Sequence, residues 1–241
     1  MKKRLVITDL TRMQQGHVCI CGYDKEHACI RPILLHGIPE TALVRDGRPI
    51  IFPFALVEFD FLSPRPEAPH TEDYFYISSS PVFIQRVAHP EKVLEWSLFE
   101  TVEDIFEQPV LTDFGFSVLD GQGPRSVGTI RPAKIENIIY ENGLEGAWDY
   151  RIEFTDSSGR RYRLKITDLT WHYYCNSLRG QFASADACAA EMIRKLQGKN
   201  VYLRIGLSRG WKKFPERCFL QLNGIYTFPD YLDGKTFVDF Y

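Results

Sequence analysis

The sequence predicts a mainly β protein of 241 residues, built from two small Greek-key barrels with short inserted helices. Short apolar or alternating runs separated by turn residues recur along the chain, as expected for curved antiparallel strands. Two phrases also occur twice: Ile-Thr-Asp-Leu-Thr at 7–11 and 166–170, and Ile-Arg-Pro at 30–32 and 130–132. A module present twice explains the repeats, although the two phrases recur in a different order, so a simple tandem duplication does not follow.

The first module is predicted over residues 1–87. A three-strand meander is expected first, over residues 4–10, 17–23 and 28–34. The long apolar run 49–62 contains Pro53, which favours a bulge or an edge position in a strand that bends around a small barrel. The proline-rich segment 63–69 cannot continue a sheet, and residues 74–77 and 82–87 are expected as the last strands.

Residues 88–128 are predicted to form an acidic helical linker between the modules. Pro90 is placed like a first-turn proline, and apolar residues with flanking glutamates continue to Pro109. Residues 61–120 contain 3 basic and 11 acidic side chains, whereas residues 121–241 contain 18 and 13. The middle of the chain therefore repels polyanions and the C-terminal half attracts them, if the charges cluster in space.

The second module is predicted over residues 129–241. Strands are expected at 129–141, 150–155 and 161–169, with a hairpin turn at 156–159. Ser184 is the expected cap of a helix over 185–196 that stops at Gly198. Residues 200–208 and 218–222 then form a hairpin around a basic loop at 209–217. Strands of this length in two sets favour barrels of the oligonucleotide/oligosaccharide-binding (OB) type, with a single β-sandwich or other small barrels as the alternative.

Several classes of protein are disfavoured by the sequence. No apolar run reaches the 18 residues of a membrane span, and Asp9 interrupts any signal-peptide core, so a cytoplasmic protein is expected. Six cysteines without a secretory signal indicate reduced thiols rather than a disulfide framework. Neither a P-loop nor a dinucleotide fingerprint occurs, and no cofactor is predicted.

Three segments resemble the uncharacterised bacterial dual-OB-domain protein family: residues 4–13 (RLVITDLTRM), 69–73 (PHTED) and 203–209 (LRIGLSR). The resemblance extends over nearly the whole chain. It implies two OB-like barrels and a nucleic-acid role, often discussed for genome-conflict or defence systems. It supplies no catalytic residue.

The basic loop is the main candidate binding element. Cations interleaved with a ring are what a single strand needs, since phosphates meet the charges and bases stack on aromatics. Residues 171–174 and Arg179 provide a possible second platform. The predicted nucleic-acid-binding residues are Arg131, Trp171, Arg179, Arg204, Arg209, Trp211, Lys212, Lys213 and Arg217. The alternative is an ordinary solvated loop beside buried core rings, because the whole chain has a net charge of −2. The prediction is a non-catalytic protein that binds nucleic acid, preferentially single-stranded, or a nucleotide-like ligand.

A metal-dependent nuclease or hydrolase is the first alternative. His70, Glu72 and Asp73 follow the proline-rich connector, where a loop presents them, and Asp9 or Asp168 are possible further carboxylates. The repeated aspartates are more simply turn formers that bond their own backbone. No catalytic residue is therefore assigned.

Two further alternatives concern a metal and a protein partner. His17, Cys19 and Cys21 alternate along one strand face, with His27 and Cys29 on the next strand, but Cys-x-Cys in an apolar strand is more typical of buried thiols than of structural zinc. No metal site is predicted. The acidic middle of the chain is compatible with an adaptor module that meets a protein partner.

Overall fold

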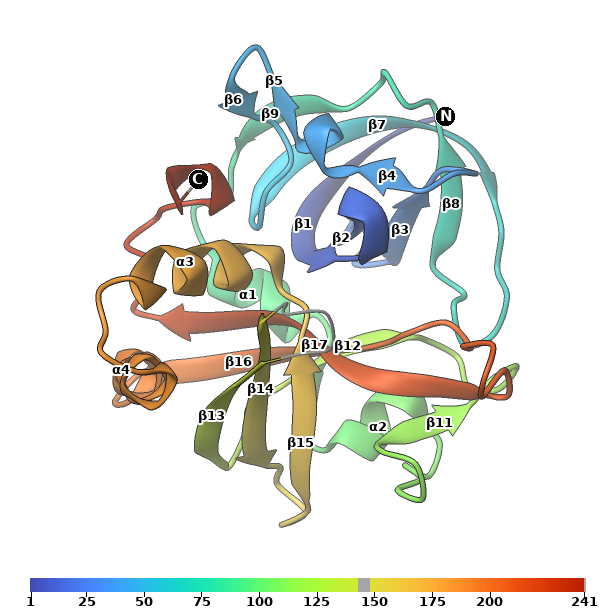
Figure 1. The fold of residues 1–241 in the computed structure, drawn as a ribbon. Coiled ribbons are helices and arrows are strands. Elements are labelled where there is room, and N and C mark those ends of the chain that lie inside the picture. The colour runs from blue at the N-terminus through green and yellow to red at the C-terminus, as the bar shows by residue number, and fades with distance from the viewer. Residues whose placement is uncertain (143–147, 241) are drawn as a thin grey trace.

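The computed structural model describes residues 1–142 and 148–240 and contains two mostly β modules stacked on each other (Figure 1). The first, blue to teal, lies above the second, green to red, with helices α1 and α3 near their boundary. Both modules have OB-like topology, which confirms the predicted fold class. Among the described residues, no helix is both long and apolar enough to cross a membrane.

The first module is a closed five-stranded barrel. Its strands are β1 (Lys2–Arg12), β2 (His17–Tyr23), β3 (Cys29–Ile33), β7 (Ala55–Pro64) and β8 (Asp73–Tyr76). The order is β1-β2-β3-β8-β7, β7 pairs back with β1, and β3 and β8 run parallel. The long β7 pairs with three neighbours, as a strand bent around a small barrel must, and β9 (Val82–Arg86) is the third of them. Inward side chains such as Leu5, Ile20 and Phe59 are fully buried and form its core.

Short elements complete the first module. They are η1 (Gln14–Gly16), β4 (Ile38–Pro39), η2 (Glu40–Leu43), β5 (Val44–Arg45) and β6 (Arg48–Pro49). β4 pairs with β2, and β5 with β6.

The second module repeats the strand order but curls into a half-barrel. The meander β13 (Lys134–Asn142), β14 (Trp148–Thr155) and β15 (Arg161–Ile166) meets β17 (Arg217–Phe228) in a parallel contact, and β17 pairs with β16 (Asn200–Leu207). Within the described part of the chain β13 pairs with β14 alone, and α4 (Ala185–Leu196) packs against β13 where the closing strand pair would lie. β12 (Val127–Ile130) pairs with β16, the fourth barrel strand, and so extends the sheet at that edge.

The segment between the modules contains α1 (Pro90–Glu95), β10 (Leu98–Phe99), α2 (Val102–Phe106) and β11 (Ser117–Leu119). The expected helices between Pro90 and Pro109 are confirmed, and α2 begins with a capping box formed by Thr101 and Asp104. β10 and β11 pair with β12 and β17 of the second sheet. The division of the chain into a first module, a linker and a second module at residues 87 and 128 therefore stays a proposal. The last element is η4 (Phe237–Phe240).

A module present twice would place the repeated phrases in equivalent strands, and this interpretation of the repeats is wrong. Residues 7–9 lie in β1, the first barrel strand, whereas residue 166 ends β15, the third, and residues 167–168 lead into a helix. Likewise, residues 30–32 lie in β3 and residue 130 ends β12. The two copies instead touch: Thr11 forms a bridge with Asp168, and the Arg12 N–H donates to the Thr167 carbonyl at 2.7 Å. The two-module architecture rests on strand order, which the repeats do not encode.

Helix α3 (Leu169–Arg179) replaces the end of the strand expected over 161–169. Asp168 causes the change, because its Oδ1 accepts the N–H of Trp171 at 3.1 Å and so caps the helix, while Oδ2 accepts the N–H of Ile225 at 3.0 Å. Burial raises the pKa of this carboxyl to about 7. The predicted helix over 185–196 is confirmed as α4, with Ser184 as its cap.

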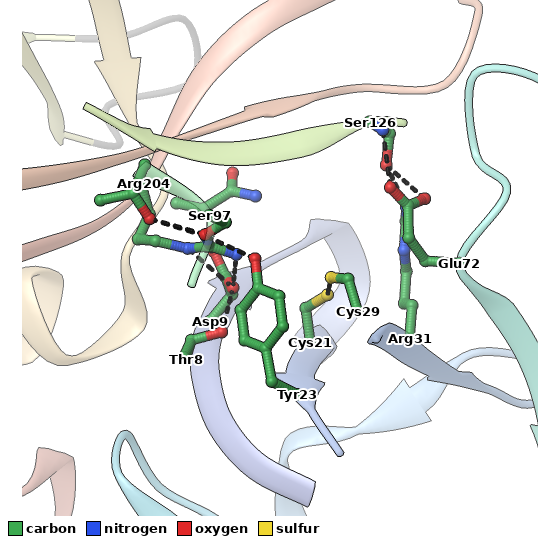
Figure 2. A network of polar contacts seen from close by, with 12 residues as sticks. Thr8, Asp9, Cys21, Tyr23, Cys29, Arg31, Glu72, Ser97, Ser126 and Arg204 are labelled. Atoms are coloured by element: carbon green, nitrogen blue, oxygen red, sulfur yellow. Dashed lines mark hydrogen bonds and ion pairs between the residues drawn. The ribbon is translucent and has the colours of Figure 1, made fainter. Parts of the chain in front are cut away.

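A fully buried arginine joins the modules (Figure 2). Arg204 of β16 donates to Asp9 of β1, from Nη2 to Oδ2 at 2.6 Å and from Nε to both carboxylate oxygens at 3.1 Å. Its Nη1 donates to Tyr23, Ser97 and Thr129 at 2.8 to 3.0 Å. The charge of this group is therefore paired and each of its three nitrogens donates a hydrogen bond, which is the condition under which burying an ion pair is tolerated.

We predict that Asp9→Asn lowers the free energy of unfolding by about 3 to 5 kcal/mol, because Arg204 then stays buried without a counter-charge. The exposed ion pair of Asp60 with the N-terminus is the control, and Asp60→Asn should change stability by less than about 1 kcal/mol. Urea unfolding followed by circular dichroism measures both. The double variant Asp9→Leu/Arg204→Met should lose less than Asp9→Asn, and equal losses for Asp9→Asn and Asp60→Asn would contradict the assignment.

Candidate nucleic-acid interface

The loop at residues 208–216 connects β16 and β17, the fourth and fifth barrel strands of the second module. In OB folds this loop is one of those that contact oligonucleotides. Lys212 and Lys213 are exposed, and Trp211 is 59% exposed. A turn brings the rings together, since the Phe214 N–H donates to the Trp211 carbonyl at 2.8 Å and the two ring centroids lie 6.3 Å apart. The Lys213 ammonium lies 5.5 Å from the Phe214 ring centroid, so cations and rings share one surface.

Phe114 extends this aromatic surface, and the sequence analysis missed it. Its side chain is 61% exposed and its ring centroid lies 4.8 Å from that of Phe214. Phe114 comes from the segment before β11, about a hundred positions away in sequence from the loop it touches. No sequence pattern indicates this contact, because only the pairing of β11 with β17 creates it.

Two arginines of the predicted interface are held by acidic neighbours. Arg217 pairs with Asp113 at 2.9 Å and its side chain is only 15% exposed. Arg209 pairs with Asp73 of the first module but stays half exposed. Arg209 can therefore still face a ligand, whereas Arg217 mainly fixes the base of the loop.

The outer face of β15 provides a second basic surface, also missed from the sequence. Arg161, Arg163 and Lys165 are exposed and alternate with three buried core side chains. Arg161 and Lys165 make ion pairs with the neighbouring acidic groups Glu153 and Asp149 of β14, at 2.7 and 3.0 Å. β14 and β15 are the second and third barrel strands, and this is the face that OB folds use for oligonucleotides. The period-two alternation of basic residues was a readable signal.

Arg204 and Trp171 must be removed from the predicted interface. Both side chains are 0% exposed, so neither can contact a ligand from the surface. Arg204 points into the boundary between the modules and pairs with Asp9. Trp171 lies in the core beneath α3, 5.7 Å from the ring of Tyr231. The predicted stacking platform at residues 171–174 is therefore mostly core, with His172 and Tyr174 also buried.

Arg131 and Arg179 are exposed but lie on other elements. Arg131 follows β12, pairs with Glu95 at 3.2 Å and lies 4.6 Å from the ring centroid of Tyr202. Arg179 ends α3 and lies 5.9 Å from the ring centroid of Tyr140. Figure 1 shows α3 and the β16–β17 loop on opposite sides of the second module. The structure therefore does not gather all predicted residues along one path.

His70, Glu72 and Asp73 do converge, but on an arginine. Arg31 of β3 donates from Nη2 to Glu72 at 3.0 Å and from Nη1 to His70 Nδ1 at 3.0 Å, and its Nε lies 3.2 Å from Asp73 Oδ1. Glu72 also accepts the backbone N–H and the hydroxyl of Ser126 at 2.7 and 3.0 Å, as Figure 2 shows. The side chains of His70, Glu72 and Asp73 are each at most 5% exposed. These contacts link the modules and occupy the carboxylates that a metal ion would need.

Cys21, Cys29 and His27, three of the candidate zinc ligands, make contacts of their own. Cys19, Cys21 and Cys29 are free thiols, with the Cys21 and Cys29 sulfurs 3.2 Å apart. His27 stacks on Trp96 with ring centroids 4.1 Å apart. Within the described ranges, no group of three or more His, Cys, Asp or Glu side chains is arranged to hold a metal ion.

A comparison with known protein families agrees with this topology. A family model described as a dual OB-containing domain matches residues 3–225. The chain belongs to this family. No curated protein matches it. Among solved structures, it is similar to a chain from a replication protein A heterotrimer bound to ssDNA, with 9% sequence identity and a TM-score of 0.37. That alignment covers 93% of this chain and 49% of the other, so the chain spans about half the length of that neighbour.

The two OB modules of this dual-OB chain differ in which face is open. On β1, β2 and β3 the outward side chains Asp9, Cys21 and Arg31 line a narrow polar space together with Ser126 and Asn223 of the second half of the chain. The face that would bind a ligand in the first barrel is therefore covered by the second module. The corresponding face of the second module is not covered in this way: its side chains are exposed on β15 and half-buried on β14.

The buried His70 should make stability depend on pH. Burial and the nearby cations Arg31 and Arg209 lower its pKa to about 3, whereas an unfolded histidine titrates near 6.5. Below pH 6.5 this imidazole binds a proton in the unfolded chain but stays neutral in the folded chain. We therefore predict that the free energy of unfolding falls by up to about 1.4 kcal/mol per pH unit between pH 6 and 4 because of this group.

Chemical unfolding at pH 7.5, 6 and 5 measures this effect. His70→Asn keeps an acceptor for Arg31 and should flatten the pH dependence relative to the unmodified protein. His36→Asn, at an exposed histidine, is the control and should leave the pH dependence unchanged. Parallel pH profiles for His70→Asn and the unmodified protein would contradict the burial of a neutral imidazole.

Proposed function

We propose that this chain binds single-stranded nucleic acid without catalysing a reaction, through its second OB module. The observation that carries the proposal is the exposed Trp211 beside Lys212 and Lys213 on the loop between the fourth and fifth barrel strands. Lysines neutralise phosphates and an exposed ring stacks on a base whatever its identity. Phe114 offers a second ring within the same aromatic group.

The open face of β14 and β15 supports the same proposal. Three cations in alternate positions of β15 follow one strand, and a phosphate backbone that crosses this face meets them in succession. Their acidic partners on β14 reduce the field of the face, which favours moderate, salt-sensitive binding over tight binding. In this proposal the first barrel supports the second and does not itself meet the strand, because its equivalent face is covered.

A nuclease function is less well supported. Glu72 and Asp73 face the guanidinium of Arg31, and a catalytic metal would have to compete with that cation. The sequence resemblance to dual-OB proteins motivates the further proposal that the protein acts in a bacterial genome-conflict or defence system, in the cytoplasm. That proposal does not depend on the basic loop binding a strand. A protein partner on the acidic segment and a nucleotide-like ligand remain separate proposals.

For the loop, Lys212→Ala/Lys213→Ala should weaken binding to all single-stranded oligonucleotides to a similar degree. Each lost phosphate contact reduces the slope of log affinity against log salt by about 0.7, so the double variant should be shallower by about 1.4. Fluorescence anisotropy with a labelled single strand at several salt concentrations gives both values. Lys2→Ala/Lys25→Ala, which removes two exposed lysines of the first module, is the matched control and should behave like the unmodified protein.

Trp211→Ala should act through stacking instead of charge. We expect a loss of about 1 to 3 kcal/mol in binding free energy with an almost unchanged salt slope. The same anisotropy titrations separate the two effects. Undiminished affinity in both loop variants, or the same loss in the lysine control, would refute the proposed interface.

Catalysis is tested directly by incubating the purified chain with single- and double-stranded substrates and Mg²⁺ or Mn²⁺. We expect no cleavage, because the convergent carboxylates are paired with Arg31. Cleavage that Asp73→Ala abolishes, but that Asp60→Ala retains, would favour the nuclease alternative.

A further inference from the structure

A cavity of about 100 Å³ lies where the first barrel, the start of α3, the end of β17 and the C-terminal segment meet. Four rings contribute to its wall: Phe54, Tyr226, Phe228 and Tyr231. It is separate from the basic loop, because the loop precedes β17 and the cavity is lined by the last residues of that strand. Nine strand residues span about 30 Å, so the two places are far apart along β17.

Two hydroxyl groups of the cavity wall make no hydrogen bond to any described residue. They are Oγ1 of Thr170 and the phenol oxygen of Tyr231, in side chains that are each 4% exposed. Buried hydroxyls are normally paired, since an unpaired one loses its hydrogen bonds to water without replacement. The neighbouring carboxylate of Asp168 accepts two backbone N–H groups, and neither hydroxyl is hydrogen-bonded to it.

The backbone at Phe54 is strained in a way that places its ring in the wall. Its φ angle is +65°, a left-handed conformation that bulky side chains rarely adopt. The strain is held by backbone bonds, since the Phe54 N–H donates to the Ile7 carbonyl at 2.7 Å and its own carbonyl accepts from Val87 at 2.9 Å. The ring stands edge-on to Tyr226 at 4.7 Å. Strained residues of this kind cluster at ligand sites.

We propose that this cavity is a binding site for a single pyrimidine ring. An engineered apolar cavity of about 150 Å³ holds one benzene molecule, so the volume here suits one ring better than the two fused rings of a purine. The aromatic wall supplies stacking surfaces. Each free hydroxyl both donates and accepts, which matches the mixed donor and acceptor edge of a pyrimidine. Arg86 and Lys235 line the cavity together with the carboxylates of Asp168 and Asp230, and the two cations are the groups that would face an attached phosphate.

The pyrimidine has two sources, a free nucleotide or a base at the end of a bound strand. Uridine 5′-monophosphate and cytidine 5′-monophosphate test the free nucleotide, with adenosine 5′-monophosphate as the two-ring comparison. Isothermal titration calorimetry and saturation-transfer NMR on the full chain should detect the two pyrimidine nucleotides and at least five-fold weaker binding of the purine. A short oligothymidylate is then added as a competitor of the mononucleotide. If it displaces the mononucleotide equally well from the unmodified protein and from Lys212→Ala/Lys213→Ala, the site takes a base at the end of a strand.

Tyr231→Phe and Thr170→Val remove only the unpaired hydroxyls. Each should weaken pyrimidine nucleotide binding at least five-fold, and neither should lower the melting temperature, because no hydrogen bond within the chain is lost. Tyr76→Phe is the matched control, since the Tyr76 hydroxyl in the first barrel is also buried without a partner but does not line the cavity. It should leave nucleotide binding unchanged.

The proposal and the proposed strand interface fail independently. Lys212→Ala/Lys213→Ala should keep mononucleotide binding, whatever it does to oligonucleotides. Undetectable binding of both pyrimidine nucleotides at millimolar concentration would overturn the cavity site. So would equal binding by Tyr231→Phe, Tyr76→Phe and the unmodified protein, or a preference for the purine.

Discussion

The buried ion pair of Arg204 and Asp9 is the constraint on which the arrangement of this molecule depends. A guanidinium with no exposed surface is tolerated only with a full set of acceptors, and these come from three separated stretches of the chain. Asp9 and Tyr23 belong to the first barrel, Ser97 to the intervening segment, and Thr129 to β12 beside Arg204 in the second sheet. The pair therefore has its geometry only when the modules are docked.

A second ionic cluster repeats this arrangement at the other side of the boundary. Arg31 of the first barrel holds Glu72 and Asp73, and Glu72 in turn binds Ser126 of the following segment. Both clusters lie on the outward side of β1 to β3 and the strand β8 beside them. The consequence is functional, because an OB barrel usually offers the outer face of its second and third strands to a ligand. Here the first barrel gives that face to its neighbour, and the second module keeps its own face open.

The buried polar groups of the molecule differ in how fully they are hydrogen-bonded within the chain. Most of them, such as Arg204 and Asp168, have all their hydrogen bonds within the chain and stabilise its fold. The hydroxyls of Thr170 and Tyr231 have none, and both belong to the wall of a cavity. Other buried hydroxyls without a partner, such as that of Tyr76, lie outside the cavity, so the candidate ligand site is marked by unpaired hydroxyls that adjoin an open space.

The sequence by itself determined the fold class and many of the elements. Alternating apolar residues, turn residues and the caps at Pro90 and Ser184 are local features, and local physics decides them. It also located the exposed loop around Trp211, because charges, a ring and glycine between two strands need no distant partner to be exposed. The alternating basic residues of β15 are an equally local feature, and they indicate an exposed basic strand face.

Tertiary structure alone decided which of the chemically similar residues face solvent. Arg204 and Arg209 are five positions apart and both pair with a carboxylate of the first barrel, yet Arg204 is fully buried against Asp9 whereas Arg209 stays half exposed beside Asp73. Trp171 and Trp211 differ in the same way, since α3 packs one into the core. The repeated phrase was misleading for the same reason: Asp9 is an ion-pair partner and Asp168 is a helix cap. A side chain's role depends on what the docked modules place against it, and that information is distributed over the whole chain.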